Sequence, residues 1–201
     1  MNSSDDNSTL PLGFLTVIEH PAHGLFGGYL VLSQSGRPIE FHCTAPMKSS
    51  RAQEILYGPT LKPFLYGEQI GGTLLAKAEN APSAVYTDQE AALAVRDRVS
   101  VPVALVLPTN ENLAYIDSAA VESANESDTT AGYPRADAAH QGRPKLLTFQ
   151  LGRNRLALAE EHDDDQPLIA ERFGGLAESF DLMEPFGRIR EAIAEAQQAV
   201  R

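Results

Sequence analysis

The residues with the greatest potential for chemistry lie between positions 40 and 53. Glu40 and His42 are two positions apart in a segment that alternates apolar and polar residues, PIEFHCT at positions 38–44. A period of two is typical of a half-buried β-strand, so both side chains are expected on its outward face. A carboxylate beside an imidazole is a common acid–base pair, and Arg51 downstream could hold an anionic substrate.

Cys43 directly follows His42, which suggests a nucleophile beside its base. Neighbouring residues on a strand point to opposite faces, so a bond between these two side chains would require a bulge. Cys43 instead shares its face with Ile39 and Phe41. Because free cysteine is among the most buried residue types, we expect Cys43 to be a core residue.

A hairpin and a helix would position these groups. The apolar run at positions 25–32 and the alternating segment at 38–44 flank the turn sequence SQSGR, which predicts a β-hairpin. Ser50 and Gln53 fit a capping box, so a helix is expected to begin there and to end before Gly58. The buried side of that helix is predicted to consist of Ala52, Ile55 and Leu56.

The junction between this strand and this helix is where we expect a ligand, because a helix N-terminus favours anions. Aromatic residues and arginine also contribute most to interface energetics. The candidate binding residues are therefore Glu40, His42, Arg51, Gln53, Tyr57 and Tyr66, the last four expected at the surface.

The remaining polar clusters predict neither a metal site nor a cofactor. A structural zinc site usually has four ligands, whereas this region offers His20, His23 and His42 with a thiol on the wrong face. The acidic run at positions 160–165 lacks the spacing and the glycine of a calcium loop. The glycine-bearing segments GLFGG and GEQIGG do not match phosphate-binding loops.

Part of this region resembles the signature of an uncharacterised bacterial protein family, EF..T.P....RAQ.ILYG, which is present from Glu40 to Gly58. The likeness continues more weakly at positions 66–68 and 185–186, and covers most of the chain outside the N-terminal tail and an acidic insert. No activity is established for that family. The resemblance therefore implies a bacterial cytoplasmic domain and transfers no catalytic residue.

Composition favours a cytoplasmic protein. The chain has 201 residues, a formal net charge of −11 and 16 dispersed basic residues, which argues against nucleic acid or anionic membranes as partners. A single cysteine fits a reducing compartment. The N-terminus has no secretory signal, and the longest apolar run, at positions 101–107, is too short to span a bilayer.

The pattern of segments predicts an α/β (α+β) fold. We expect a mixed, largely antiparallel sheet with two hairpins, the second at positions 146–159, and helices in the middle and at the C-terminus. A strand at 84–86, a helix and a buried strand at 101–107 predict one crossover unit. The domain is expected to span positions 12–201, after a disordered tail at 1–11, with a flexible acidic insert at about 110–144.

The function favoured by these observations is a non-catalytic binding or regulatory module that acts through a protein partner, without nucleic acid or membrane. The alternative is a small hydrolase or nuclease-like enzyme that uses Glu40 and His42, with Arg51 as anion holder. A homo-oligomer formed through an exposed sheet edge is a third possibility.

Overall fold

The computed structural model describes residues 11–108 and 144–198. The tail predicted at 1–11 and the insert predicted at 110–144 lie outside this range, apart from Pro11 and Pro144. No helix in the described part of the chain is long and apolar enough to cross a membrane.

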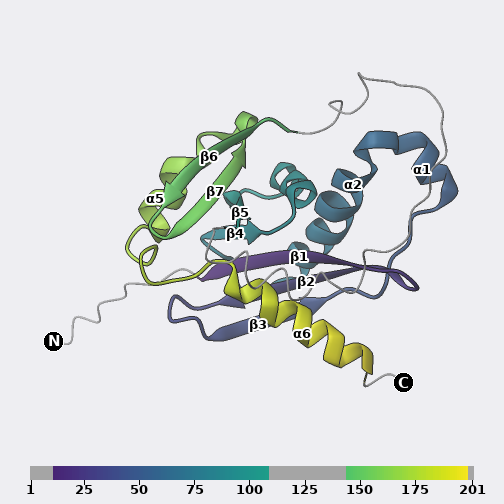
Figure 1. Cartoon of the computed structure of the whole chain (residues 1–201), viewed down its shortest axis with the longest axis horizontal. Helices are drawn as coiled ribbons and strands as arrows, with labels where there is room; N and C mark the ends of the chain where they lie inside the picture. Colours follow the sequence, from purple (N-terminus) through teal and green to yellow (C-terminus); the bar gives the residue numbers. More distant parts are fainter. Residues whose placement is uncertain (1–10, 109–143, 199–201) are drawn as a thin grey trace.

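A seven-stranded mixed sheet organises the molecule, in the order β3-β2-β1-β4-β5-β7-β6 (Figure 1). Strands β1, β4 and β5 are parallel, and all the other neighbours are antiparallel. The predicted hairpins, the crossover unit and the α+β class are confirmed. The strands are β1 (Leu12–His20), β2 (Gly24–Leu32), β3 (Pro38–Cys43), β4 (Ala84–Thr87), β5 (Val103–Leu107), β6 (Leu146–Leu151) and β7 (Asn154–Ala159).

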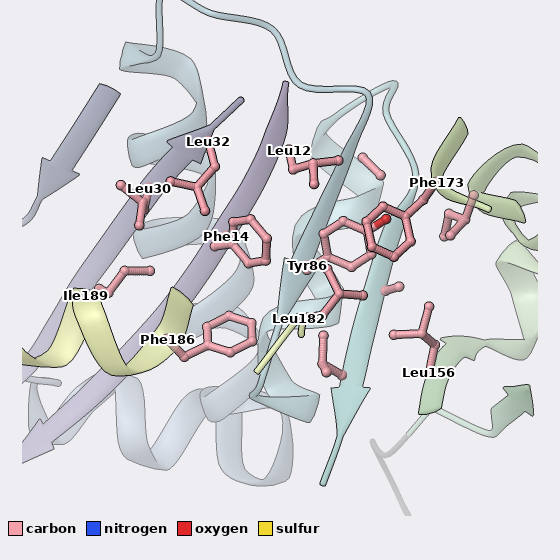
Figure 2. Packing of buried hydrophobic residues seen from close by; sticks show 14 of the residues in the cluster. Leu12, Phe14, Leu30, Leu32, Tyr86, Leu156, Phe173, Leu182, Phe186 and Ile189 are labelled. Atoms are coloured by element: carbon pink, nitrogen blue, oxygen red, sulfur yellow. The ribbon is translucent and has the colours of Figure 1, made fainter. Parts of the chain in front are cut away.

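Two helices near the C-terminus cover one face of the sheet. Helices α5 (Asp165–Phe173) and α6 (Glu184–Gln198) bury their apolar sides against alternate residues of the strands. Figure 2 shows Phe14 and Tyr86 of the sheet beside Phe173 and Phe186 of these helices. The helix expected at the C-terminus forms, and its buried residues Phe186, Ile189 and Ile193 are spaced three and four apart.

A continuous helical path follows β3, and its later part, from Leu65 onward, covers the other face. It consists of α1 (Arg51–Tyr57), the 3₁₀ turn η1 (Gly58–Thr60), α2 (Leu61–Pro63), the π-helical segment η2 (Phe64–Gly71) and α3 (Gly72–Lys77). A nine-residue 3₁₀ helix, η3 (Glu90–Arg98), packs beside η2. This second layer completes a three-layer arrangement around the sheet.

Gly27 and Gly28 allow helices to approach β2 closely on both faces. A Cβ atom on Gly27 would lie 2.1 Å from Ile70 of η2, and one on Gly28 would lie 2.2 Å from Ile189 of α6. The glycines of η2 do not face these two positions. Instead, Ile70 contacts Gly27, whereas Gly67 leaves room for η3.

Candidate functional site: the Glu40–His42 pair

Strand β3 alternates as predicted, but its faces are reversed relative to our expectation. Ile39, Phe41 and Cys43 are exposed, whereas Glu40 and His42 are partly buried. The prediction that Cys43 is a core residue is therefore wrong. The reason is that β3 is the edge strand: α6 packs on β1 and β2, whereas the end of α3 lies over the opposite face of β3.

The two polar side chains of β3 contact each other. His42 Nε2 lies 2.5 Å from Glu40 Oε1, and 29% of the His42 side chain and 11% of the Glu40 side chain remain exposed. Side chains two positions apart on a strand lie on the same face, so Glu40 and His42 can contact each other within β3. The structure thus joins the acid and the imidazole proposed for acid–base chemistry.

The loop after α3 holds the Glu40 carboxylate from the other side. The Glu79 N–H donates to Oε1 at 2.9 Å and to Oε2 at 3.2 Å. The Asn80 N–H and its side-chain Nδ2 each donate to Oε2 at 3.0 Å. The hydrogen bond from Glu79, followed by those from His42 and Asn80, lowers the pKa of Glu40 to about 2. Glu40 is therefore ionised at neutral pH.

An ionised Glu40 fixes the tautomer of His42. A carboxylate only accepts hydrogen bonds, so His42 Nε2 must carry the proton that lies between them. In the neutral ring the free electron pair is then on Nδ1, which has no hydrogen-bond partner among the described residues. This arrangement can accept a proton from a bound molecule at Nδ1.

Tyr29 of β2 lies next to the Glu40–His42 pair, on the neighbouring strand. It is the cross-strand partner of His42 and is fully buried. Its hydroxyl has no hydrogen-bond partner among the described residues, and a Cβ on Gly13 would lie 2.5 Å from it. Burial, followed by the nearby charge of Glu40, raises the pKa of Tyr29, so the phenol stays neutral.

Helix α1 holds Arg51 and Gln53 away from the Glu40–His42 pair. Gln53 completes the predicted capping box with Ser50, whose side chain accepts from the Gln53 N–H at 3.2 Å. Arg51 pairs with Glu54 at 3.1 Å and its side chain is 82% exposed. Neither residue contacts Glu40 or His42 in the described part of the chain.

The buried side predicted for α1 is wrong. None of its residues is buried, and Ile55 and Leu56 are 67% and 82% exposed. The capping box and Gly58 set the ends of this helix, but the helical path docks on the sheet only further along the chain, with Leu65 as its first buried residue. Local signals define a helix without defining what covers it.

The two candidate tyrosines have different environments. Tyr57 stacks on Phe64, with ring centroids 4.1 Å apart. Tyr66 is only 2% exposed, so its predicted surface position is wrong. Its hydroxyl donates to Glu19, which also pairs with Lys62 at 2.9 Å. The hydrogen bond from Tyr66 and then the contact with Lys62 lower the pKa of Glu19.

The remaining histidine candidates line a separate groove between β3 and α6. His20, His23 and Cys43 border this space of about 640 Å³ with apolar residues of α6 such as Ile193. The rings of His20 and His23 lie 4.6 Å apart. In the described part of the chain, no group of three or more His, Cys, Asp and Glu residues is placed to hold a metal ion.

Sequence reasoning missed three polar contacts between distant segments. Asn80 contacts Glu40 across 40 positions. Thr16 donates to Asp88 at 2.7 Å, and Arg190 of α6 pairs with the same carboxylate. Asp88 directly follows β4, at the carboxyl end of a parallel strand, and this position was the signal that could have found it.

No family model matches the chain, and no curated protein matches it. Among solved structures, it is similar to Ciona intestinalis endonuclease V in complex with a 24mer DNA containing an inosine followed by a ribo-adenosine. The identity is 12%, the TM-score is 0.45, and the match covers 93% of this chain and 87% of the other. A variant of that enzyme with a 23mer DNA gives 13% identity and a TM-score of 0.37, covering 74% and 70%.

These matches correct two of our predictions. They are structures of an endonuclease bound to DNA, whereas we expected a non-catalytic module with a protein partner and no nucleic acid. With TM-scores of 0.45 and 0.37, they assign neither an activity nor a substrate to this chain.

Proposed function

We propose that this protein is a small hydrolase, nuclease-like in its class of reaction, in which His42 acts as the general base. The observation that carries the proposal is the Glu40–His42 contact of 2.5 Å, with the carboxylate anchored by the backbone and side chain of the neighbouring loop. An imidazole oriented by a fixed carboxylate is a recurrent arrangement in hydrolytic sites on unrelated folds.

Each group has a distinct role. Glu40 stays ionised, holds the His42 ring in the tautomer with a proton on Nε2, and stabilises the imidazolium that forms. His42 Nδ1 takes a proton from a water molecule as that water attacks the substrate, and later returns it to the leaving group. Tyr29 excludes water from the inner side of the pair because its ring is fully buried.

The test is hydrolysis by the purified protein of a defined panel of substrates. The panel contains single- and double-stranded DNA and RNA oligonucleotides, bis(4-nitrophenyl) phosphate and 4-nitrophenyl acetate. We expect one of these substrates to be hydrolysed, and His42→Gln and Glu40→Gln to lower kcat by about 100-fold, the lower end of the effect of general-base catalysis.

His162→Gln is the matched control. His162 also contacts a carboxylate, that of Asp97 at 3.0 Å, so its replacement removes the same chemical group from another place. We expect its activity to stay within about twofold of wild type. Equal activity of His42→Gln and wild type, or no hydrolysis of any substrate in the panel, would refute the proposal.

A further inference from the structure

We infer that Asn80 is a positioning residue of this site, one that keeps the Glu40 carboxylate turned toward His42. The inference rests on the proposed function for its catalytic consequence, but its structural part can be measured without any activity. Asn80 does not contact His42; it acts through Glu40.

The division of contacts between the two carboxylate oxygens supports this role. Oε1 is shared by His42 Nε2 and the Glu79 N–H. Oε2 accepts from Asn80 twice, through the backbone N–H and through Nδ2, and more weakly from Glu79. The Asn80 amide is the one side chain in the described part of the chain that hydrogen-bonds Oε2. It therefore opposes rotation of the carboxylate about its terminal bond, which is intrinsically soft.

The direction of the chain after α3 explains why the N–H groups of the loop can reach the Glu40 carboxylate. Ala78 leaves the helix in an extended conformation, with φ −66° and ψ 132°. The next two N–H groups, those of Glu79 and Asn80, both reach Glu40 on the edge strand β3. Removing the Asn80 side chain therefore removes one hydrogen bond to Oε2, whereas the backbone N–H groups of Glu79 and Asn80 still donate to it.

The loop offers a matched control one residue away. The Glu79 side chain makes no hydrogen bond or ion pair with another described residue, whereas its backbone N–H does. Glu79→Gln and Asn80→Ala thus alter neighbouring side chains, of which only Asn80 contacts the site. The titratable side chains that interact with Glu40 are His42 on its own strand, through a hydrogen bond, and Tyr29 on β2, through the charge of Glu40; neither is changed in Asn80→Ala.

The experiment measures the carbon-13 titration of Glu40 and the nitrogen-15 shifts of the His42 ring in the full chain, together with kcat and KM. In Asn80→Ala we expect the pKa of Glu40 to rise, because one hydrogen bond that lowers it is lost, and the proton on Nε2 to be less strongly favoured over Nδ1. We expect kcat to fall about tenfold with KM unchanged, because orientation acts on the chemical step.

Asn80→Ser keeps a short donor and should recover part of both effects, while Glu79→Gln should give neither. A lower melting temperature in Asn80→Ala with unchanged Glu40 titration and ring shifts would overturn the inference, since it would show a structural role alone. Should Asn80→Ala unfold, Asn80→Ser decides by the same two spectra. If the spectra change while wild type hydrolyses nothing, the positioning role stands and the proposed function fails.

Discussion

Residues 11–108 and 144–198 contain two carboxylate–histidine pairs, and they differ in what supports the carboxylate. Glu40 and His42 share one face of β3, and Glu40 also accepts from two backbone N–H groups and from Asn80. Asp97 of η3 and His162, in the 3₁₀ turn after β7, meet across 65 positions at 3.0 Å. The Asp97 side chain is 65% exposed, against 11% for Glu40.

This difference indicates which pair is preorganised. A carboxylate held by fixed donors presents one oxygen to its histidine in one geometry, which is what a catalytic pair requires. An exposed aspartate can rotate, exchange its partner for water and be screened by salt. The same two chemical groups are therefore expected to behave as a unit in one region and as independent surface residues in the other.

The largest expected effect is on hydrolysis by double variants. If Glu40 and His42 act as a unit, Glu40→Gln and His42→Gln each lower kcat about 100-fold, and the double variant loses little more. The corresponding single and double variants of Asp97 and His162 should all remain within about twofold of wild type. Steady-state rates on whichever substrate of the panel is hydrolysed measure this. Losses that multiply to about 10⁴-fold in the first pair would show independent roles.

The next largest effect is on stability. Glu40→Ala removes the acceptor of several N–H groups in the loop after α3, and we expect the free energy of unfolding to fall by about 1.5 kcal/mol. Asp97→Ala removes one contact at an exposed side chain and should cost less than about 0.5 kcal/mol. Urea denaturation measures both. Equal losses would mean that the anchoring of Glu40 adds nothing to the fold.

The sheet could be predicted because its signals are local. The period of two, the SQSGR turn and the Gly152-Arg153 turn each involve neighbouring residues, and they define both hairpins. The same holds for the capping box of Ser50 and Gln53. Alternation says that two faces differ, but which face is covered depends on where distant helices lie. In β3 the covered face is the polar one, with Glu40 and His42, so the face that carries Cys43 is exposed.

The support of the candidate site could not be predicted for a related reason. Glu40 and His42 were found because they are two positions apart on one strand. Asn80 lies 40 positions from Glu40, in a loop with no periodicity, and its contact depends on how α3 ends over an edge strand. A pattern in the sequence can thus indicate the reactive groups, whereas the groups that orient them follow from tertiary packing.

A smaller effect is the pH dependence that Glu40 adds to stability. The pKa of Glu40 is lowered from 4.5 to about 2 in the folded protein, so the unfolded chain binds a proton at that carboxyl more readily. The stabilisation is complete above about pH 4.5 and is lost as the pH falls from 4.5 toward 2. We expect the difference in the free energy of unfolding between wild type and Glu40→Gln to shrink over that window. Urea denaturation at several pH values tests this, with Asp97→Asn as control; a difference that stays constant would contradict the anchored carboxylate.

The smallest expected effect separates the pairs by their response to salt. Between 0.05 and 0.5 M NaCl the Debye length falls below the size of a side chain, so an exposed pair loses most of its attraction, whereas a shielded one keeps it. His162→Gln should therefore change the free energy of unfolding by less than about 0.5 kcal/mol at low salt, and by nothing measurable at high salt. The effect of Glu40→Ala should persist at both, because its N–H donors lie within 3.2 Å and 11% of its side chain is exposed. If salt removed both effects alike, the two pairs would be equivalent surface contacts, and the chemical distinction between them would no longer hold.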